Sequence, residues 1–409
     1  MRHFGGRSLE LSDDPRPMNH KHLVLLGGGE SHLEVLRQLA ASPLPGVRVT
    51  LVAPSPYHVH LPRLPAWVAG RCEFQDIAVP LAPWAQRAQA ELVEAELLSI
   101  DPSQRRLNLS GGRSLTYDTL SVDALAVAHR ESIPGARGHA LFVRPVLQFI
   151  HFWEAVIKLS EQQILSLVVV GGDAAAVELS IAIQRRLKRR ARVALVTGGG
   201  PPLALAPEPF RQRVKVALKR NQVTLFEDRC DAISGRQMQL GQGMRLGCDA
   251  PVVAEPPSPP LWLFDSGMSL DANGFLVTGP TLQTLSHPEV FACGELAVRS
   301  GQAARPGGWY PSRPTPPPGL LATNLRRFLA GRSLAHDERR PAWGVQLLDV
   351  ADGRALAHLG GGVSVEGRWV GWLKANADAR LMDRFGLEIP PDALGAETAA
   401  NPQDSEPAA

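Results

Sequence analysis

Hydrophobic positions divide the start of the chain into a short apolar run and a helical pattern. The run at residues 23–26 ends at three glycines, and an apolar run bounded by turn residues is typical of a buried strand. Beyond the turn, apolar side chains recur at Leu33, Leu36 and Leu39, close to the spacing of one helix face. The pattern therefore predicts a strand, a tight turn and a helix over residues 21–39.

The same pattern recurs at residues 165–183. An apolar run leads into Gly171 and Gly172, and the residues after them, including Val177 and Ile181, are apolar at helical spacing. Gly171 follows Gly27 by 144 residues, a period far too long for a solenoid. A strand, a glycine turn and a helix open a dinucleotide-binding unit, so the chain is predicted to contain two such units.

The first turn is predicted to bind a pyrophosphate. Gly27 allows the sharp turn, and Gly29 lacks a Cβ, so an anion can approach the amides at the helix N-terminus. His32 stands where the dinucleotide fingerprint has its third glycine. A plain strand-to-helix turn without a ligand is the alternative interpretation.

The second turn carries Asp173 where its backbone should lie against a pyrophosphate. A side chain there takes space and adds a like charge, which predicts weak binding of NAD(P)H. Ala176 fills the last position of the fingerprint, which tolerates alanine. The alternative is that Asp173 caps the following helix and points away from any nucleotide.

Later segments add further elements. A strand at residues 47–52 continues into Ala53-Pro54-Ser55, without the acid that usually binds ribose hydroxyls. The remaining expectations are a hairpin over 105–116, strands at 117–127, 191–197, 274–277 and 290–292, a linking helix at 144–158, strands within 341–365 and a helix at 368–385.

Composition narrows the class of protein. Of 409 residues, 44% are hydrophobic, which is enough for real cores, and the length fits two domains plus a smaller third. The formal net charge of +3 gives no indication of a nucleic-acid partner, and none is predicted. Neither a run of about 18 apolar residues nor a signal-peptide core is present. We expect a cytoplasmic protein that is soluble or peripheral to the inner face of the membrane.

The cysteines and histidines point to no metal. Cys72, Cys230, Cys248 and Cys293 form no close pair, so four reduced thiols are expected. His58 and His60 lack a carboxylate or thiol nearby in the sequence, and two histidines alone are a poor ligand set. The prediction is no metal site, and no catalytic residue is assigned.

The order of elements resembles the two-dinucleotide-fold flavoproteins, which include pyridine nucleotide-disulfide oxidoreductases and type II NADH dehydrogenases. It is most similar to the flavoprotein half of fusions with selenide, water dikinase. The likeness covers about residues 20–386. The matching pieces are HLVLLGGGESH at 22–32, LPAWVAG at 64–70, VVVGGDAAAVEL at 168–179, LQTLSHPEVFACGE at 282–295 and LATNLRRFLAG at 321–331.

This resemblance implies an α/β fold with two Rossmann-like domains, the second inserted in the first, and a small C-terminal α+β domain. The implied bounds are a disordered leader at 1–17, an FAD-binding domain at 18–145, an inserted NAD(P)-binding domain at 146–272, a return segment at 273–340, a C-terminal domain at 341–389 and a disordered tail at 390–409.

The resemblance also implies a function. FAD and NAD(P)H are the expected cofactors, with hydride passing from NAD(P)H to flavin and electrons to a quinone or other acceptor. A selenide, water dikinase partner and a homodimer are further expectations. Independently of the resemblance, Trp369 and Trp372 lie near Arg368 and Lys374, a mix typical of a membrane interface, so peripheral membrane contact is expected, with a helix packed on the domain as the alternative. The alternative is a non-catalytic relative that keeps the fold and acts as a binding or scaffold protein.

The expected cofactor-binding residues lie in three segments. The first and third would hold FAD, with the third near its ribityl and phosphate groups, and the second would face NAD(P)H. They are Gly27, Gly28, Gly29, Glu30 and Ser31, then Gly171, Gly172, Asp173 and Ala174, and last Gly294 and Glu295.

Overall fold

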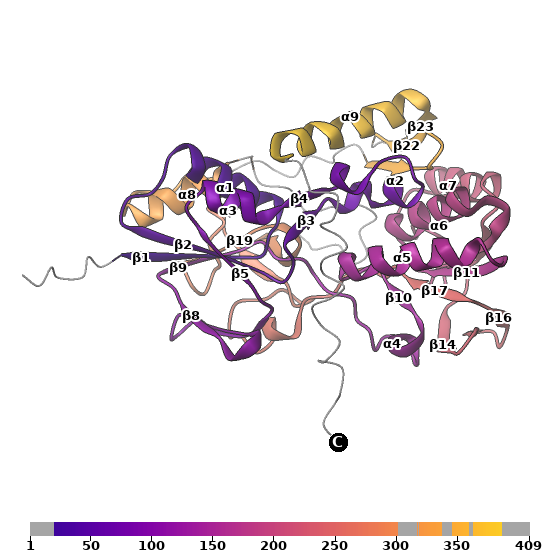
Figure 1. Ribbon diagram of the computed structural model, residues 1–409, viewed down its shortest axis with the longest axis horizontal. Helices are drawn as coiled ribbons and strands as arrows, with labels where there is room; N and C mark the ends of the chain where they lie inside the picture. Colours follow the sequence, from indigo (N-terminus) through magenta and orange to yellow (C-terminus); the bar gives the residue numbers. More distant parts are fainter. Residues whose placement is uncertain (1–19, 302–316, 318, 338–345, 360–362, 387–409) are drawn as a thin grey trace, which may run out of the picture.

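The structure is a computed structural model that describes residues 20–301, 317, 319–337, 346–359 and 363–386 (Figure 1). The predicted leader at 1–17 and the predicted tail at 390–409 lie outside the described residues.

The first sheet contains five parallel strands in the order β19-β9-β1-β2-β5. The strands are β1 (Lys21–Leu26), β2 (Val47–Ala53), β5 (Glu91–Glu94), β9 (Thr119–Val122) and β19 (Val290–Ala292). Its strands pack with helices α1 (Glu30–Ala41), α3 (Leu81–Arg87) and α8 (Leu320–Leu329). Short strands β3 (Tyr57–Val59) and β4 (Ala78–Pro80) pair beside it, and α2 (Leu64–Val68), in the segment that joins them, packs against α6 (Ala174–Leu187) of the second unit.

The second sheet repeats this design, with five parallel strands in the order β10-β17-β11-β12-β13. The strands are β10 (Leu141–Phe142), β11 (Leu165–Val170), β12 (Ala191–Val196), β13 (Thr224–Phe226) and β17 (Ala250–Val253). Its helices are α5 (Val146–Ser160), α6 (Ala174–Leu187) and α7 (Glu208–Arg220), and the short α4 (Ala136–His139) precedes β10. In each sheet the central strand, β1 or β11, leads into a glycine turn and a helix, so the predicted duplication is confirmed.

An antiparallel three-stranded sheet is inserted at the same place in each unit. The first consists of β6 (Leu97–Asp101), β7 (Arg106–Leu109) and β8 (Ser114–Thr116), and the second of β14 (Cys230–Ser234), β15 (Gln237–Leu240) and β16 (Arg245–Gly247). All strands of the second sheet lie between residues 141 and 253, and β19 then returns to the first sheet. Strands β18 (Leu276–Thr278) and β20 (Ala297–Arg299) form a small pair near this return.

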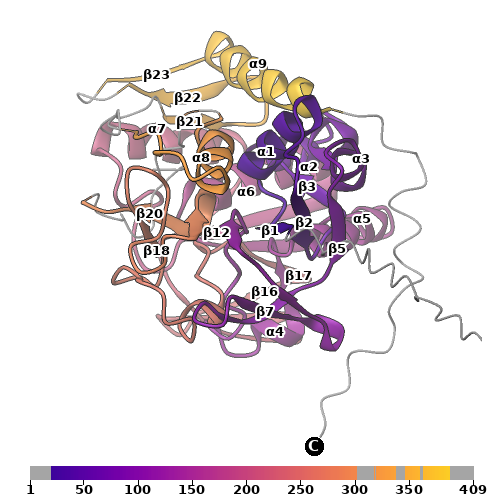
Figure 2. The same ribbon diagram turned by 90° about the vertical axis from the view of Figure 1, so that its left-hand side faces the viewer.

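The C-terminal segment bridges the two units. Strands β21 (Gln346–Asp349), β22 (Ala355–His358) and β23 (Ser364–Gly367) form an antiparallel sheet, and α9 (Arg368–Phe385) follows. Figure 1 and Figure 2 show α9, in yellow, lying across one side of the molecule. Its last residue, Phe385, packs on Trp84 of the first unit, while Glu366 pairs with Arg220 of the second.

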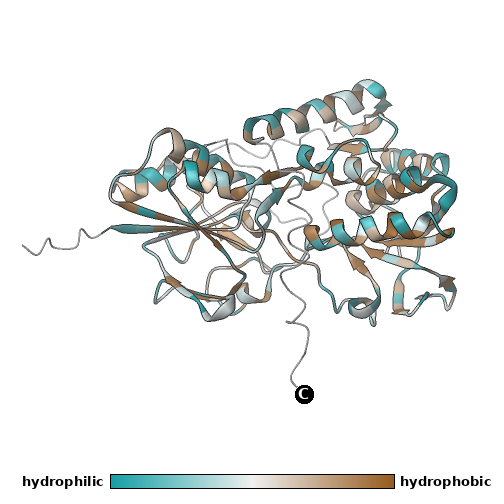
Figure 3. Ribbon diagram, viewed as in Figure 1, coloured by the Kyte–Doolittle hydropathy of each residue, from teal (hydrophilic) through white to brown (hydrophobic). Residues whose placement is uncertain are grey.

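Hydrophobic side chains fill the space between sheets and helices. The strands of both large sheets are predominantly hydrophobic in Figure 3, and Leu25 and Val169 at their centres are fully buried. The helix predicted at 368–385 has the predicted bounds. The strand predicted at 117–127 is wrong in length, because β9 ends at Val122 and Asp123 turns toward α1. No helix in the described part of the chain is long and apolar enough to cross a bilayer.

Candidate functional site

The N-terminus of α1 is held by the chain's own carboxylate, that of Asp123. Its Oδ2 accepts hydrogen bonds from the amides of Ser31 at 2.8 Å and His32 at 3.2 Å. The Gly29 amide donates to the Asp123 carbonyl at 3.1 Å. A helix N-terminus attracts anions through its unpaired amides and the helix dipole. Asp123 therefore supplies at this turn the negative charge that a pyrophosphate was predicted to supply.

The glycines around Asp123 are required by this close approach. A Cβ on Gly29 would lie 2.2 Å from the Asp123 carboxyl carbon, and one on Gly294 would lie 2.1 Å from Asp123 Oδ1. Gly27 adopts a φ of +98°, and its Cβ would meet the Asp123 carbonyl oxygen at 2.3 Å. Contacts within the chain thus account for glycine at all three positions.

His32, at the place of the third glycine, is a buried structural residue. Its Nδ1 lies 2.6 Å from the Gly27 carbonyl, and its Nε2 lies 2.8 Å from Ser121 Oγ. Burial lowers the pKa of His32, so the ring is neutral and ties α1 to β1 and β9. This large side chain fits because both of its ring nitrogens have partners inside the fold.

The second turn has the capping arrangement that was the alternative for Asp173. The Asp173 carboxylate accepts the Ala176 amide at 3.0 Å and caps α6, which begins at Ala174. Burial raises the pKa of Asp173 to about 6. A Cβ on Gly171 would meet the Ala254 carbonyl oxygen at 2.4 Å, and one on Gly172 would meet that of Thr197 at 2.5 Å. The chain's own backbone accounts for these glycines too.

Glu295 is engaged in an ion pair between the two units. The Arg144 guanidinium donates to both Glu295 oxygens, at 2.7 Å and 2.8 Å, and the Ala126 amide donates to Glu295 Oε2 at 3.1 Å. Arg144 lies two residues before the start of α5 of the second unit, and Glu295 follows β19 of the first. The bidentate pair therefore fixes the crossing between the two sheets.

Glu30 meets two histidines from the segment after β2. One ligand atom each of Glu30, His58 and His60 lies within 4.8 Å of the others. Glu30 Oε1 is 2.8 Å from His60 Nδ1. The premise that no carboxylate is near these histidines was therefore wrong. Glu30 approaches from α1, distant in the sequence, because α1 and β3 meet beside the first turn.

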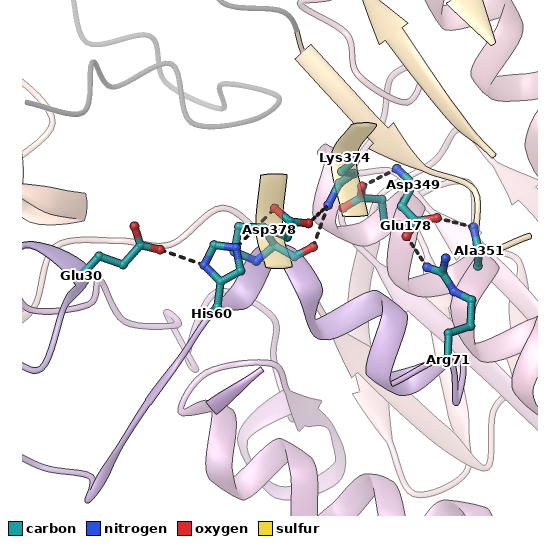
Figure 4. Close-up of polar contacts among 9 residues, drawn as sticks. Glu30, His60, Arg71, Glu178, Asp349, Ala351, Lys374 and Asp378 are labelled. Atoms are coloured by element: carbon teal, nitrogen blue, oxygen red, sulfur yellow. Dashed lines mark hydrogen bonds and ion pairs between the residues drawn. The ribbon is translucent and has the colours of Figure 1, made fainter. Parts of the chain in front are cut away.

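A line of polar groups runs from Glu30 to the second unit (Figure 4). His60 Nε2 lies 3.4 Å from Asp378 Oδ1, and Lys374 donates to Asp378 Oδ2 at 3.0 Å. Both Asp378 and Lys374 belong to α9. Burial lowers the pKa of His60, but the hydrogen bonds to Asp378 and Glu30 outweigh it, so the net shift is upward.

The line ends at Glu178 on α6, which is buried. The Asp349 amide donates to Glu178 Oε1 at 2.6 Å, and Arg71 pairs with the Asp349 carboxylate. Burial raises the pKa of Glu178 to about 8, and the nearby Lys374 charge partly opposes that shift. Charged groups therefore join both units through the C-terminal segment.

All four cysteines are free thiols, so none forms a disulfide in the structure. Burial raises the pKa of Cys72 to about 11 and that of Cys248 to about 12, and burial also raises that of Cys293. Because the thiolate is the reactive form, these groups are poor nucleophiles near neutral pH. The site gives no support to dithiol chemistry.

Two parallel sheets of matching strand order, each with a glycine turn at the end of its central strand, define a two-dinucleotide-fold α/β protein. The sequence profile of this class, described as pyridine nucleotide-disulphide oxidoreductase, matches residues 21–310. The chain belongs to the pyridine nucleotide-disulphide oxidoreductase family.

Curated relatives include the external NADH-ubiquinone oxidoreductase 2 of Saccharomyces cerevisiae mitochondria, which is 29% identical over 41% of this chain and 34% of its own length. The demethylphylloquinone reductase of Synechocystis is 25% identical over 50% of this chain and 52% of its own. The sulfide-quinone reductase of Aquifex aeolicus is 31% identical over 25% of this chain and 24% of its own. The chain thus matches between about a quarter and a half of the length of these relatives.

Solved structures agree on the fold. The sulfide:quinone oxidoreductase of Aquifex aeolicus superposes with a TM-score of 0.66 at 16% identity, covering 88% of this chain and 90% of that one. The NDH2 protein of Plasmodium falciparum in complex with NADH superposes with a TM-score of 0.68 at 12% identity, covering 90% of this chain and 99% of that one.

Sequence reasoning located both turns and the possible Asp173 cap, but it missed the carboxylate at the first turn and two residues that link the units. Glu30 and Ser31 lie at the first turn as predicted, and Gly294 joins them through Asp123. The missed residues are Asp123, Arg144 and Asp378. One signal was available, because Asp123 directly follows the strand whose carboxyl end faces the first turn.

Proposed function

We propose that this protein is an NAD(P)H oxidoreductase that uses a flavin and passes electrons to a quinone. The observation that carries the proposal is the duplicated unit, in which β1 and β11 each lead through a glycine turn into a helix. Relatives named as NADH-ubiquinone and demethylphylloquinone reductases support the quinone as acceptor. In such an enzyme a bound flavin would supply the redox chemistry between the nicotinamide and the acceptor.

The first turn, as the structure has it, does not fit the pyrophosphate of FAD. The Ser31 and His32 amides already have an acceptor in the Asp123 carboxylate, and Glu30 adds a second acid at the same helix end. Flavin binding at these amides requires Asp123 to leave them first.

The second turn has the same limitation. Asp173 occupies the amide that a nucleotide phosphate would approach at the start of α6. The chain therefore contributes to both sites by placing two helix N-termini, those of α1 and α6. Each lies at the carboxyl end of the central strand of a parallel sheet.

A second candidate function is a binding or scaffold protein that keeps the fold without catalysis. The specific observation in its favour is that carboxylates of the chain cap both helix ends where phosphates would bind, Asp123 on α1 and Asp173 on α6. A helix end that is already capped has less to gain from a bound anion.

An absorption spectrum of the purified protein separates the two candidates. Flavin bands, with their bleaching on addition of NADH or NADPH, support the oxidoreductase. Reoxidation of the bleached protein by a soluble quinone analogue identifies the acceptor class. A colourless protein that stays colourless after incubation with FAD contradicts the first candidate and leaves the scaffold.

Membrane contact, partners and domain bounds extend the proposal. Trp369 and Trp372 on α9 are 57% and 63% exposed, and Leu373 beside them is also exposed. Exposed tryptophans suit a membrane surface, so we propose peripheral contact with the inner face of the membrane from the cytoplasm. The proposal also includes two partners: a selenide, water dikinase, tested by co-purification, and a second copy of this chain, tested by light scattering. It divides the chain into six segments, with boundaries at residues 17, 145, 272, 340 and 389.

A further inference from the structure

Three potential metal ligands meet beside the first turn, and the proposed flavin chemistry assigns no role to two of them, His58 and His60. The carboxylate of Glu30 and the rings of His58 and His60 each offer one atom within 4.8 Å of the other two. Two imidazoles and a carboxylate form a known ligand set for divalent transition metals, with further positions left open.

His58 gives independent evidence for a ligand. Its Nε2 is buried and has no hydrogen-bond partner among the described residues. The whole residue is 9% exposed. A buried polar atom without a partner carries the full cost of desolvation, so native folds rarely leave one. A metal ion at the cluster would satisfy this nitrogen.

The His60 ring has the outer contact that a metal-bound histidine usually makes. His60 turns Nε2 toward the Asp378 carboxylate, at 3.4 Å, while Nδ1 faces Glu30. A carboxylate or backbone partner on the second ring nitrogen orients a ligating histidine. Lys374 in turn holds Asp378 in place.

We propose that Glu30, His58 and His60 form a binding site for a divalent transition-metal ion such as Zn²⁺ or Fe²⁺. Asp378 is the outer partner that orients His60. The three protein ligands leave coordination positions for water or a small molecule. Because Asp378 belongs to α9, the bound ion also strengthens the attachment of the C-terminal helix to the first unit.

The site requires a small rearrangement and is reachable from solvent. Metal bonds of about 2.1 Å in tetrahedral geometry separate two ligand atoms by roughly 3.4 Å. Glu30 Oε1 and His60 Nδ1 are 2.8 Å apart, so they must separate by roughly half an ångström. The Glu30 side chain is 36% exposed, which gives an ion a route from water.

The test is metal binding by the full-length, chelator-treated and flavin-free protein. Zn²⁺ is titrated in competition with a chromophoric chelator, and Co²⁺ is titrated separately because its visible spectrum reports the ligand set. We expect one tight equivalent of Zn²⁺, and a fall in affinity of at least 100-fold in His58→Ala. Glu30→Gln, which keeps the size of the side chain, should lose at least 10-fold.

The matched control is His139→Ala, which removes an exposed histidine and should leave the tight equivalent unchanged. Asp378→Asn should weaken Zn²⁺ binding by about 10- to 100-fold, as loss of an outer partner does. Tight binding that survives in both His58→Ala and Glu30→Gln overturns the site, and so does the absence of a tight equivalent in the wild type. Neither result depends on whether the protein binds flavin.

Discussion

Replacement of Asp123 by asparagine tests whether this carboxylate excludes a nucleotide from the first turn. The substitution keeps the size of the side chain and removes its charge. A phosphate bound to neighbouring amides would lie about 5 Å from the carboxylate, and at an effective dielectric of about 20 the repulsion is roughly 3 kcal/mol before screening. If salt and water leave a third of that, the free energy of binding changes by about 1 kcal/mol.

The expected result is a gain in FAD affinity of about 5-fold or more in Asp123→Asn, measured by quenching of flavin fluorescence during reconstitution of the apoprotein. The variant also loses part of two charge-assisted hydrogen bonds to Ser31 and His32, so its melting temperature should fall slightly.

Asp118→Asn is the matched control for this experiment. Asp118 also accepts a backbone amide, that of His22, at 2.7 Å, but it lies before β9, at the other end of the sheet from the turn. The control should lose stability without gaining affinity. A folded Asp123→Asn protein with unchanged FAD affinity would show that the carboxylate and the flavin do not compete, and the electrostatic reasoning would fail.

Three further outcomes follow from other groups. Glu178→Gln keeps the acceptor for the Asp349 amide. Burial raises the pKa of Glu178 to about 8 in the folded protein. The stability that the protonated carboxyl contributes is therefore fully present below about pH 4.5 and is lost as pH rises through 8. The melting temperature of Glu178→Gln should therefore rise relative to that of the wild type as pH increases from 5 to 8.5. A difference in melting temperature that does not change with pH would contradict this. Asp173→Gly should lower the melting temperature by removing a cap and, because it frees the Ala176 amide, should raise NADH or NADPH affinity in fluorescence titrations, whereas Asp173→Asn should keep the cap; unchanged nucleotide affinity in a folded Asp173→Gly protein would show that the cap and a phosphate do not compete. Replacement of Trp369 and Trp372 by serine should reduce flotation with liposomes without a change in melting temperature, and equal flotation would exclude membrane contact at these residues.

Local patterns predicted the elements because each depends on neighbouring residues. The glycine turns follow apolar runs, and the bounds of α9 were correct because its composition changes sharply at Gly367 and Gly386. The contacts that decide the site join distant parts of the chain. Asp123 reaches Ser31 across 92 residues, and no periodicity in one sequence encodes such a pairing.

The same limit explains the error about the histidines. His58 and His60 have no acid beside them in the sequence, but the first turn brings Glu30 to them. Asp378 is 318 residues from His60 and arrives only because α9 folds back over the first unit. Asp173 was different, because a cap is a local interaction, and the sequence already offered that interpretation.

The polar line that runs through α9 makes the two nucleotide units and the C-terminal helix one thermodynamic system. His60 and the Pro62 carbonyl of the first unit contact Asp378 and Lys374 of the helix, and the charge of Lys374 acts on Glu178 of α6. Linkage between two sites is reciprocal. A ligand that changes the charge at Glu30 therefore changes the free energy with which α9 docks on the first unit. A partner that binds α9 and changes that docking changes the affinity of the ligand at Glu30 by the same factor. Binding of Trp369 and Trp372 to a membrane surface would therefore change ligand affinity at the first turn, although the surface does not contact that turn.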